Sequence, residues 1–224
     1  MFAIDHPNVN GAVSKADYAY SSIRRKILDG EFEPGARLVI VQIARDIDVS
    51  VVPVREAVRR LEAEGFIVYT RNVGATVASV DLSRYPETVE TQAILEGAAT
   101  GLAAPFLRLA DIKKARRINL NLQRYLEAND HRQFAVGNKN FHNTLFEPCP
   151  NRHLYEMVLK EWDLLETTRR AAFSFVPERA MESIGEHEAL LQLIEGSPDP
   201  KPVEAFAREH RLRTVRYQIG RAHV

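Results

Sequence analysis

Cysteine is nearly absent from this chain of 224 residues, and its scarcity limits the chemistry that the protein can use. The single cysteine, Cys149, lies between two prolines and has no second thiol in the chain with which to form a disulfide. A framework of intramolecular disulfides, as in small secreted domains, is therefore excluded. The sequence predicts a protein of a reducing compartment, with Cys149 as a small side chain in a turn.

Long apolar runs are lacking as well. No stretch approaches the roughly 20 consecutive apolar residues that a membrane-spanning helix needs. Asp5 and Pro7 lie where a signal peptide would require an apolar core. We therefore expect a cytoplasmic protein that has no membrane partner.

The chain also has no net charge, because 30 Lys and Arg residues balance 30 Asp and Glu residues. Bulk charge gives no support to nucleic acid binding, so such a role has to rest on a motif. The length suffices for two modest domains, and the hydrophobic fraction of 45% is that of a soluble globular protein.

The most informative stretch runs from Val49 to Leu61 and combines apolar and charged residues at helical spacing. Ser50 can accept the free amide hydrogens at the start of a helix, and Pro53 fits the first turn, where no intrahelical donor is needed. The spacing predicts an apolar face that packs and a charged face that can meet a polyanion. The apolar face comprises Val54, Ala57, Val58 and Leu61.

Shorter patterns on either side complete a DNA-binding unit. Upstream, Leu38, Val41, Ile43, Ala44 and Ile47 predict a short helix that ends in a tight turn, which makes a helix-turn-helix. Downstream, residues 66–69 and 75–80 favour strands, and residues 71–74 favour the turn between them. The sequence therefore predicts a winged helix-turn-helix domain over residues 14–80.

The second half of the chain is predicted to be helical throughout. Six segments with three-to-four spacing of apolar residues are separated by Asn, Pro and Gly breakers, and they cover residues 86–107, 111–128, 130–146, 152–170, 177–195 and 202–217. Helices without a strand favour an all-α bundle over residues 84–220. The expected fold class is thus mainly α, an N-terminal winged helix-turn-helix followed by an all-α helical bundle.

The motifs of both halves resemble one family. In the first half they are Pro34-Gly35-Ala36-Arg37-Leu38, Val49-Ser50, Pro53–Leu61, Glu64-Gly65 and Gly74. Residues 22–80 as a whole resemble the DNA-binding domain of the GntR family of bacterial transcription regulators. In the second half Leu95-Glu96, Phe141-His142, Asn151, His187 and His210 resemble the all-helical ligand-binding (FCD) domain of the FadR-like branch of that family.

The resemblance implies a set of DNA-contacting residues: Arg37, Ser50, Val51, Pro53, Arg55, Arg59 and Gly74. Arg37 and Arg55 would hold phosphates or base edges, and Ser50 would hold the DNA backbone at the helix N-terminus. The family usually carries an arginine in place of Val51, and a valine offers only apolar contact, for instance to a thymine methyl. The alternative interpretation is that the arginines form a solvated helix face.

Four residues of the second half predict a metal site. Asn138 and His142 are four residues apart and share a helical face, while His187 and His210 lie within later helices. Facing helices of a bundle can bring such ligands to one ion. The resemblance implies a divalent metal, zinc or nickel, although metal-binding relatives carry a carboxylate at the place of Asn138. The alternative is four separately satisfied polar groups in a metal-free pocket.

A metal held by three imidazoles and a neutral amide keeps its positive charge and would attract an anion. We therefore expect the effector to be a small carboxylate metabolite. Gln92 stands where many relatives place an arginine that can face the pocket, so its neutral amide weakens the case for a second carboxylate clamp.

These patterns predict a metabolite-responsive transcription regulator, more often a repressor, which binds a two-fold operator in double-stranded DNA as a homodimer. It would not be an enzyme. The rival interpretation is a metal-dependent hydrolase or isomerase in which three histidines activate water. That rival needs a general base, and the spacing places neither Glu96 nor Glu186 near the metal.

Overall fold

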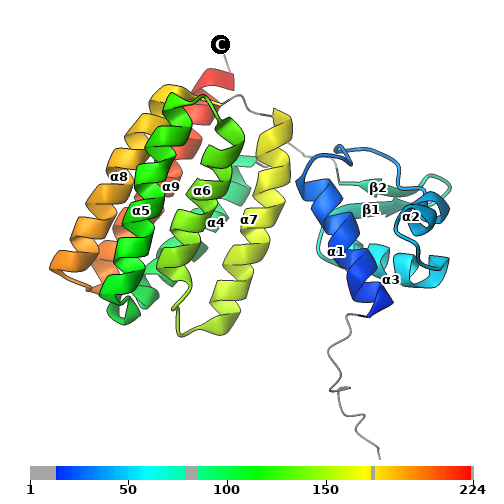
Figure 1. Ribbon diagram of the computed structural model, residues 1–224, viewed down its shortest axis with the longest axis horizontal. Coiled ribbons are helices and arrows are strands. Elements are labelled where there is room, and N and C mark those ends of the chain that lie inside the picture. The colour runs from blue at the N-terminus through cyan, green and yellow to red at the C-terminus, as the bar shows by residue number, and fades with distance from the viewer. Residues whose placement is uncertain (1–13, 79–84, 173–174, 223–224) are drawn as a thin grey trace, which may run out of the picture. The chain divides into compact units, whose positions relative to one another are not determined.

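The computed structural model describes residues 14–78, 85–172 and 175–222. The chain divides into two compact units, Met1–Ser79 and Val80–Val224 (Figure 1). The first is a winged helix-turn-helix and the second a bundle of helices, so the predicted fold class is confirmed. The last residues of the second predicted strand and the predicted domain boundary, residues 79–84, lie outside the described residues.

In the part of the winged unit that the structure describes there are three helices and a hairpin: α1 (Lys15–Leu28), α2 (Ile40–Asp46), α3 (Val51–Ala63), β1 (Ile67–Thr70) and β2 (Gly74–Val77). The strands pair antiparallel, with Ile67 opposite Val77. Gly74 opens β2 with a φ of +96°, a conformation that side chains with a Cβ rarely adopt. A backbone hydrogen bond joins the hairpin to the segment before α2, because the Leu38 N–H donates to the Ala75 carbonyl at 2.9 Å.

The core of this unit forms on the predicted apolar face of α3. Its four apolar residues are all buried, and they pack with buried residues of α1, α2 and both strands. One prediction for α2 was wrong, because Val41 is 49% exposed. Ile43 and Ala44 are the residues of this short helix that are buried in the core, and Val41 lies on another side of it.

Ser50 is the N-cap of α3, but within the described chain its side chain makes no capping hydrogen bond. An N-cap oxygen accepts from the N–H of the second or third helical residue. The third residue here is Pro53, which has no N–H. The expected side-chain cap was therefore wrong, and the Ser50 hydroxyl is left at an exposed helix N-terminus.

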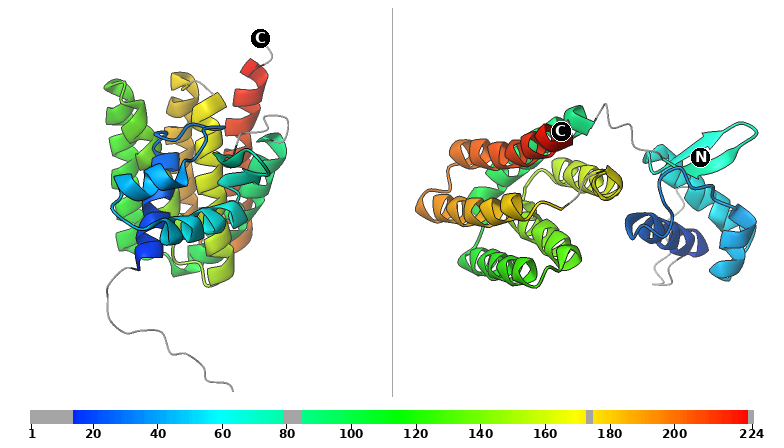
Figure 2. Two further views of the ribbon diagram at one scale, coloured as in Figure 1. Left: turned by 90° about the vertical axis from the view of Figure 1, so that its right-hand side faces the viewer. Right: turned by 90° about the horizontal axis from the view of Figure 1, so that it is seen from above.

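The described residues of the second unit form six long helices and one short 3-10 helix, arranged as Figures 1 and 2 show. They are α4 (Tyr85–Ala103), η2 (Ala104–Phe106), α5 (Leu109–Glu127), α6 (His131–Phe146), α7 (Arg152–Ala172), α8 (Pro177–Gly196) and α9 (Pro200–Ala222). α4 packs against α6, α7 and α9, α5 packs against α6 and α8, and α8 packs against α9. Among the described helices none combines the length and apolarity that crossing a membrane requires.

The backbones of α4 and α9 approach closely at two glycines. A Cβ on Gly97 would lie 2.9 Å from the Arg208 Cβ, and one on Gly101 would lie 2.7 Å from the Pro200 carbonyl oxygen. These two glycines therefore face α9. This contact brings Glu96, the neighbour of Gly97, within reach of α9 side chains. Leu102, one of the apolar residues spaced three to four apart in residues 86–107, is 40% exposed.

Candidate metal centre and DNA-reading surface

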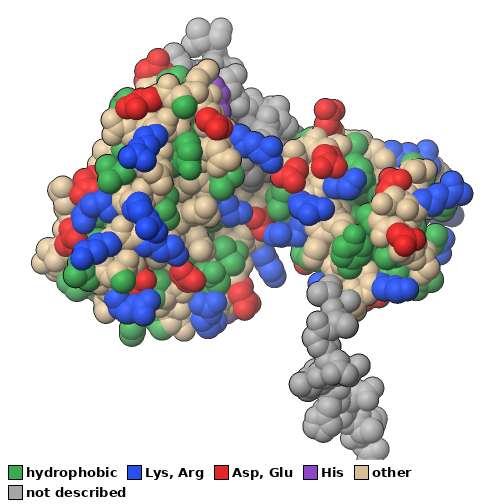
Figure 3. All heavy atoms as spheres, viewed as in Figure 1, with side chains coloured by type: hydrophobic (Ala, Val, Ile, Leu, Met, Phe, Trp, Pro, Cys, Tyr) green, Lys and Arg blue, Asp and Glu red, His purple; other side chains and the backbone are tan. Residues whose placement is uncertain are grey.

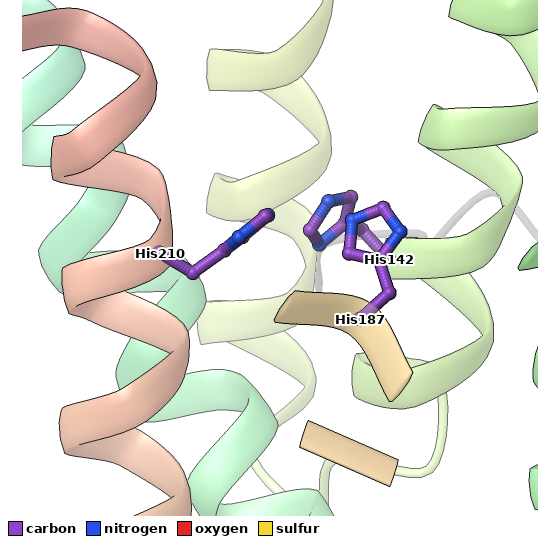
Figure 4. A group of neighbouring side chains, drawn as sticks. All are labelled: His142, His187 and His210. Carbon is purple, nitrogen blue, oxygen red and sulfur yellow. The ribbon is translucent and has the colours of Figure 1, made fainter. Parts of the chain in front are cut away.

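Three histidines from three helices meet in the core of the bundle. His142 of α6, His187 of α8 and His210 of α9 are buried and point toward one another (Figure 4). Their ring centres are 5.0 Å apart for His142 and His187, 5.2 Å for His142 and His210, and 4.9 Å for His187 and His210. One ring nitrogen of each lies within 4.8 Å of the others. The predicted convergence is found, and metal binding stays a prediction.

A side-chain oxygen from another residue holds the Nδ1 atom of each ring. The Glu96 carboxylate lies 2.8 Å from His142 Nδ1, and the Glu186 carboxylate lies 2.6 Å from His210 Nδ1. The Asn119 amide oxygen lies 2.9 Å from His187 Nδ1. Since the amide nitrogen of Asn119 donates to the Ile184 carbonyl, its oxygen must accept.

These contacts fix the tautomers, because an ionised carboxylate or an amide oxygen can only accept. Nδ1 carries the hydrogen in all three rings, and Nε2 keeps a lone pair. The Nε2 of His142 is buried and has no partner among the described residues. The Nε2 of His187 lies 3.3 Å from the Ser183 hydroxyl, which donates to it.

Burial keeps the three imidazoles neutral. Desolvation lowers the pKa of His142 even though the adjacent Glu96 charge opposes it. It lowers the pKa of His187 well below its usual range, and it lowers the pKa of His210 to about 4, although the hydrogen bond that His210 donates to Glu186 opposes this shift. Neutral imidazole is the form that binds a metal.

The two glutamates stay ionised because cations surround them. Burial would raise the pKa of Glu96, but the charge of Arg211 and the contact with His142 outweigh it and lower the pKa to about 2. Burial likewise opposes the hydrogen bonds of His210 and Arg179 to Glu186, whose pKa is also lowered to about 2. Both carboxylates are thus fixed acceptors for the ring N–H groups.

The donor set fits a transition metal. Three buried imidazole nitrogens are ligands that zinc and nickel accept, and an oxygen that holds the opposite ring nitrogen is the usual outer support of a metal-binding histidine. The unpartnered Nε2 of His142 is the atom that such an ion would satisfy. Asn138 is partly buried on α6, one turn before His142, so it shares that side of the helix.

Sequence reasoning missed the residues that orient the rings. It considered Glu96 and Glu186 only as general bases, and it did not consider Asn119. Asn119 did leave a signal, because it interrupts the apolar stripe of α5 formed by Ile112, Ala115 and Leu122. No local signal indicated the role of Glu186. Adjacent residues of a helix point in different directions, so its position next to His187 does not show that it contacts a ring on α9.

The charged face of α3 lies on the surface of the winged unit. Arg55 and Arg59 are exposed, as predicted. Val51 is half-buried and packs against the core, whereas Val52 is 73% exposed. Arg60 forms an ion pair of 2.7 Å with Asp17 and lies over the Tyr20 ring, so it joins α3 to α1.

The remaining predicted contacts lie near the hairpin and the start of α3. Arg37 is exposed, and its backbone forms an isolated antiparallel β-bridge with Thr76 of β2. Its side chain lies next to Gly74, since a Cβ on that glycine would be 4.0 Å from Arg37 Nε. Pro53 is half-buried in the first turn of α3. On the face that Figure 3 shows, Lys and Arg side chains are interspersed with Asp and Glu side chains on both units. This mixture agrees with the zero net charge of the sequence. Contact of the predicted residues of α3 and the hairpin with DNA stays a prediction.

Comparison with known proteins gives consistent matches along the chain. Residues 15–77 match the family "Bacterial regulatory proteins, gntR family", and residues 87–213 match the "FCD domain". The uncharacterized HTH-type transcriptional regulator YdhC of Bacillus subtilis is 25% identical over 86% of this chain and 84% of its own length. A protein of Paenarthrobacter nicotinovorans, named "Probable D-xylose utilization operon transcriptional repressor", is 28% identical over 83% of this chain and 80% of its own.

A solved structure supports the same fold. The Escherichia coli protein McbR/YncC superposes with a TM-score of 0.78 at 22% identity, covering 94% of this chain and all of that chain (100%). The FCD domain match covers more than half of the chain, and the gntR family match covers residues 15–77, so the family follows. This chain belongs to the GntR family of bacterial transcription regulators and carries their FCD domain.

Proposed function

We propose that this protein is a cytoplasmic, metabolite-responsive repressor that binds a two-fold operator as a homodimer. The helical unit would bind a small carboxylate effector with the help of a divalent metal, zinc or nickel. His142, His187 and His210 would hold the ion, with Asn138 as a fourth ligand. The observation that carries this proposal is the convergence of three neutral, buried imidazoles whose Nδ1 atoms are already held.

The metal would supply positive charge to which an effector carboxylate binds. The chain's own residues orient the ligands: Glu96, Asn119 and Glu186 keep the ring hydrogens on Nδ1. Effector and operator affinity would then be coupled reciprocally, whatever the sign of the effect. Repression is supported by the relative from Paenarthrobacter nicotinovorans, which is named a probable transcriptional repressor.

The operator would be read by the exposed side of α3 together with the hairpin. Val52, Arg55 and Arg59 recur at helical spacing and are exposed. Among the large apolar side chains that the structure describes, Val52 is the most exposed, and it suits contact with a thymine methyl. Ser50 at the helix start, with Arg37 and Gly74 at the hairpin, would position the DNA backbone, and Val51 and Pro53 would add apolar contact beside them.

A hydrolase or isomerase fits this site less well. Both carboxylates that were considered as general bases accept hydrogen from a histidine Nδ1. Each also binds a guanidinium, Arg211 in the case of Glu96 and Arg179 in the case of Glu186. Neither is therefore placed to take a proton from a water molecule.

Effector titration tests the proposed function on the full-length protein. With zinc or nickel bound, at least one small carboxylic acid should change the affinity for the DNA upstream of the gene by about 5–150-fold, the usual range of allosteric coupling. Fluorescence anisotropy at fixed salt measures this, and light scattering should give the mass of a dimer. A response that persists unchanged after chelation, or a monomer that binds the operator fully, would contradict the proposal.

Substitution of Arg55 tests the reading surface. Arg55→Ala should reduce specific operator affinity by about 1–3 kcal/mol, because a bidentate contact to a base or phosphate is lost, and should leave folding unchanged because the side chain is exposed. The matched control is Arg25→Ala, which removes the same charge from an exposed position on α1. Equal operator affinity of the two variants would remove Arg55 from the interface.

A further inference from the structure

Two neutral side chains next to the histidines have buried donors without acceptors. The Gln92 amide nitrogen and the Trp162 indole nitrogen are both buried, and neither has a hydrogen-bond partner among the described residues. Gln92 is 2% exposed and Trp162 is 6% exposed. Buried polar groups in native proteins nearly always have partners, because an unpaired one is costly. Two unpaired donors on residues next to the histidine cluster therefore indicate a bound ligand that supplies acceptors.

Both donors lie beside the histidine cluster. Gln92 is one turn before Glu96 on the buried face of α4, and the Glu96 carboxylate contacts His142. The Trp162 ring centre lies 5.5 Å from that of His142. α4 and α7 pack against each other, so the two donors belong to the wall that these helices form next to His142.

This wall is electrically balanced. Arg211 is the positive charge that the described structure places against it, with its guanidinium 3.7 Å from the centre of the Trp162 ring. The same guanidinium forms an ion pair of 2.9 Å with Glu96. Among the described side chains, a second ligand carboxylate here would have no cation of its own and would be buried beside Glu96, which is strongly unfavourable. A hydroxyl group would instead accept from the indole N–H and bond with the amide of Gln92.

We infer that the effector is a hydroxy monocarboxylate, whose hydroxyl groups bind Gln92 and Trp162 while its single carboxylate binds at the histidine centre. This inference rests on the proposed function, since it names the ligand class of the same site. It assigns specificity to two neutral residues of α4 and α7, and it excludes dicarboxylates and unsubstituted fatty acids as strong ligands.

The test compares three acids of four carbons: threonate, butanoate and succinate. Calorimetry on the full-length, zinc-loaded protein should give threonate an affinity about tenfold or more above the other two, because each neutral hydrogen bond contributes a few-fold. Gln92→Leu keeps most of the side-chain volume and Trp162→Phe keeps an aromatic ring, and each variant removes one donor. Both should lower the preference for threonate over butanoate several-fold and leave butanoate affinity nearly unchanged.

Two further variants sharpen the comparison. Gln92→Arg adds a cation to the wall and should raise succinate affinity relative to threonate. Gln123→Leu makes the same change as Gln92→Leu at an exposed glutamine of α5 and should change no affinity. Circular dichroism and zinc content confirm that each variant is folded and loaded, and the ratio of affinities separates recognition from a structural defect.

The outcomes distinguish this inference from the proposed function. Butanoate or succinate binding as tightly as threonate, or a threonate preference that neither Gln92→Leu nor Trp162→Phe changes, would overturn the inference and leave effector binding intact. Failure of all three acids to bind the zinc-loaded protein would overturn it together with the effector half of the proposed function. Operator binding, measured on the same sample, tests the regulator half independently.

Discussion

Replacement of His187 by alanine is expected to remove metal binding from the helical unit, and effector binding with it. His187 is 0% exposed, and its ring points toward the other two imidazoles (Figure 4). Loss of an outer partner of a metal ligand costs about 10–100-fold in metal affinity, so loss of a ligand itself should cost more than about 100-fold. Calorimetry with Zn²⁺ or Ni²⁺ and elemental analysis of the purified protein measure this.

Asn138→Asp is expected to have a different signature. The new carboxylate is a charged ligand of the same length one turn before His142, so it should tighten metal binding. It also lowers the positive charge of the site, so an anionic effector should bind less tightly. Metal and effector affinity would therefore move in opposite directions in this variant, whereas both fall in His187→Ala.

An exposed histidine provides the control for both variants. His131→Ala removes an imidazole at the start of α6, outside the cluster, and should change neither affinity. Equal metal content in the wild type, His187→Ala and Asn138→Asp, or no metal in any of them, would leave four polar groups in a metal-free site. The winged unit and its operator binding would be untouched by that result.

Glu96→Leu is expected to destabilise the bundle by about 3–5 kcal/mol, the usual cost of breaking a buried ion pair by removing one partner. The Glu96 side chain is 1% exposed and the Arg211 side chain 11% exposed, and they lie 2.9 Å apart. Without Glu96 the guanidinium is left buried and the Nδ1 hydrogen of His142 loses its acceptor. Urea denaturation of the chelator-treated protein measures the loss.

A double variant separates the ion pair from the space that it fills. Glu96→Leu combined with Arg211→Met removes both charges and keeps much of the apolar volume, so it should be more stable than either single variant. Glu195→Leu is the control, because it breaks the more exposed pair with Arg116 and should cost clearly less stability than Glu96→Leu. A Glu96→Leu loss as small as the Glu195→Leu loss would show that the buried pair does not hold α4 to α9.

The sequence predicted the elements of this protein because helical periodicity and chain breakers are local properties. The apolar face of α3 was readable from Val54 to Leu61, and all four of its apolar residues are buried. The end of α6 before Pro148 and the start of α8 at Pro177 followed from proline, which fits the first turn of a helix but cannot continue one. The three histidines could be assigned to helix interiors, and the motifs around them indicated the family.

Other features depended on contacts between segments that are distant along the chain, which no local pattern contains. Which nitrogen of each ring faces the cluster is decided by Glu96, Asn119 and Glu186, and each of these lies on a different helix from the ring that it holds. The glycines of α4 could be seen as small, but only packing against α9 showed that they allow Glu96 to meet Arg211.

The start of α3 shows the same limit on a smaller scale. Sequence predicted Ser50 as its N-cap, which the backbone confirms, but the missing N–H of Pro53 leaves the serine side chain without a capping bond. Sequence singled out Val51 as the departure from the family, whereas packing covers Val51 in part and exposes Val52. Spacing determines the face on which a side chain lies, and only the tertiary structure determines what covers that face, because burial is a property of the neighbouring elements.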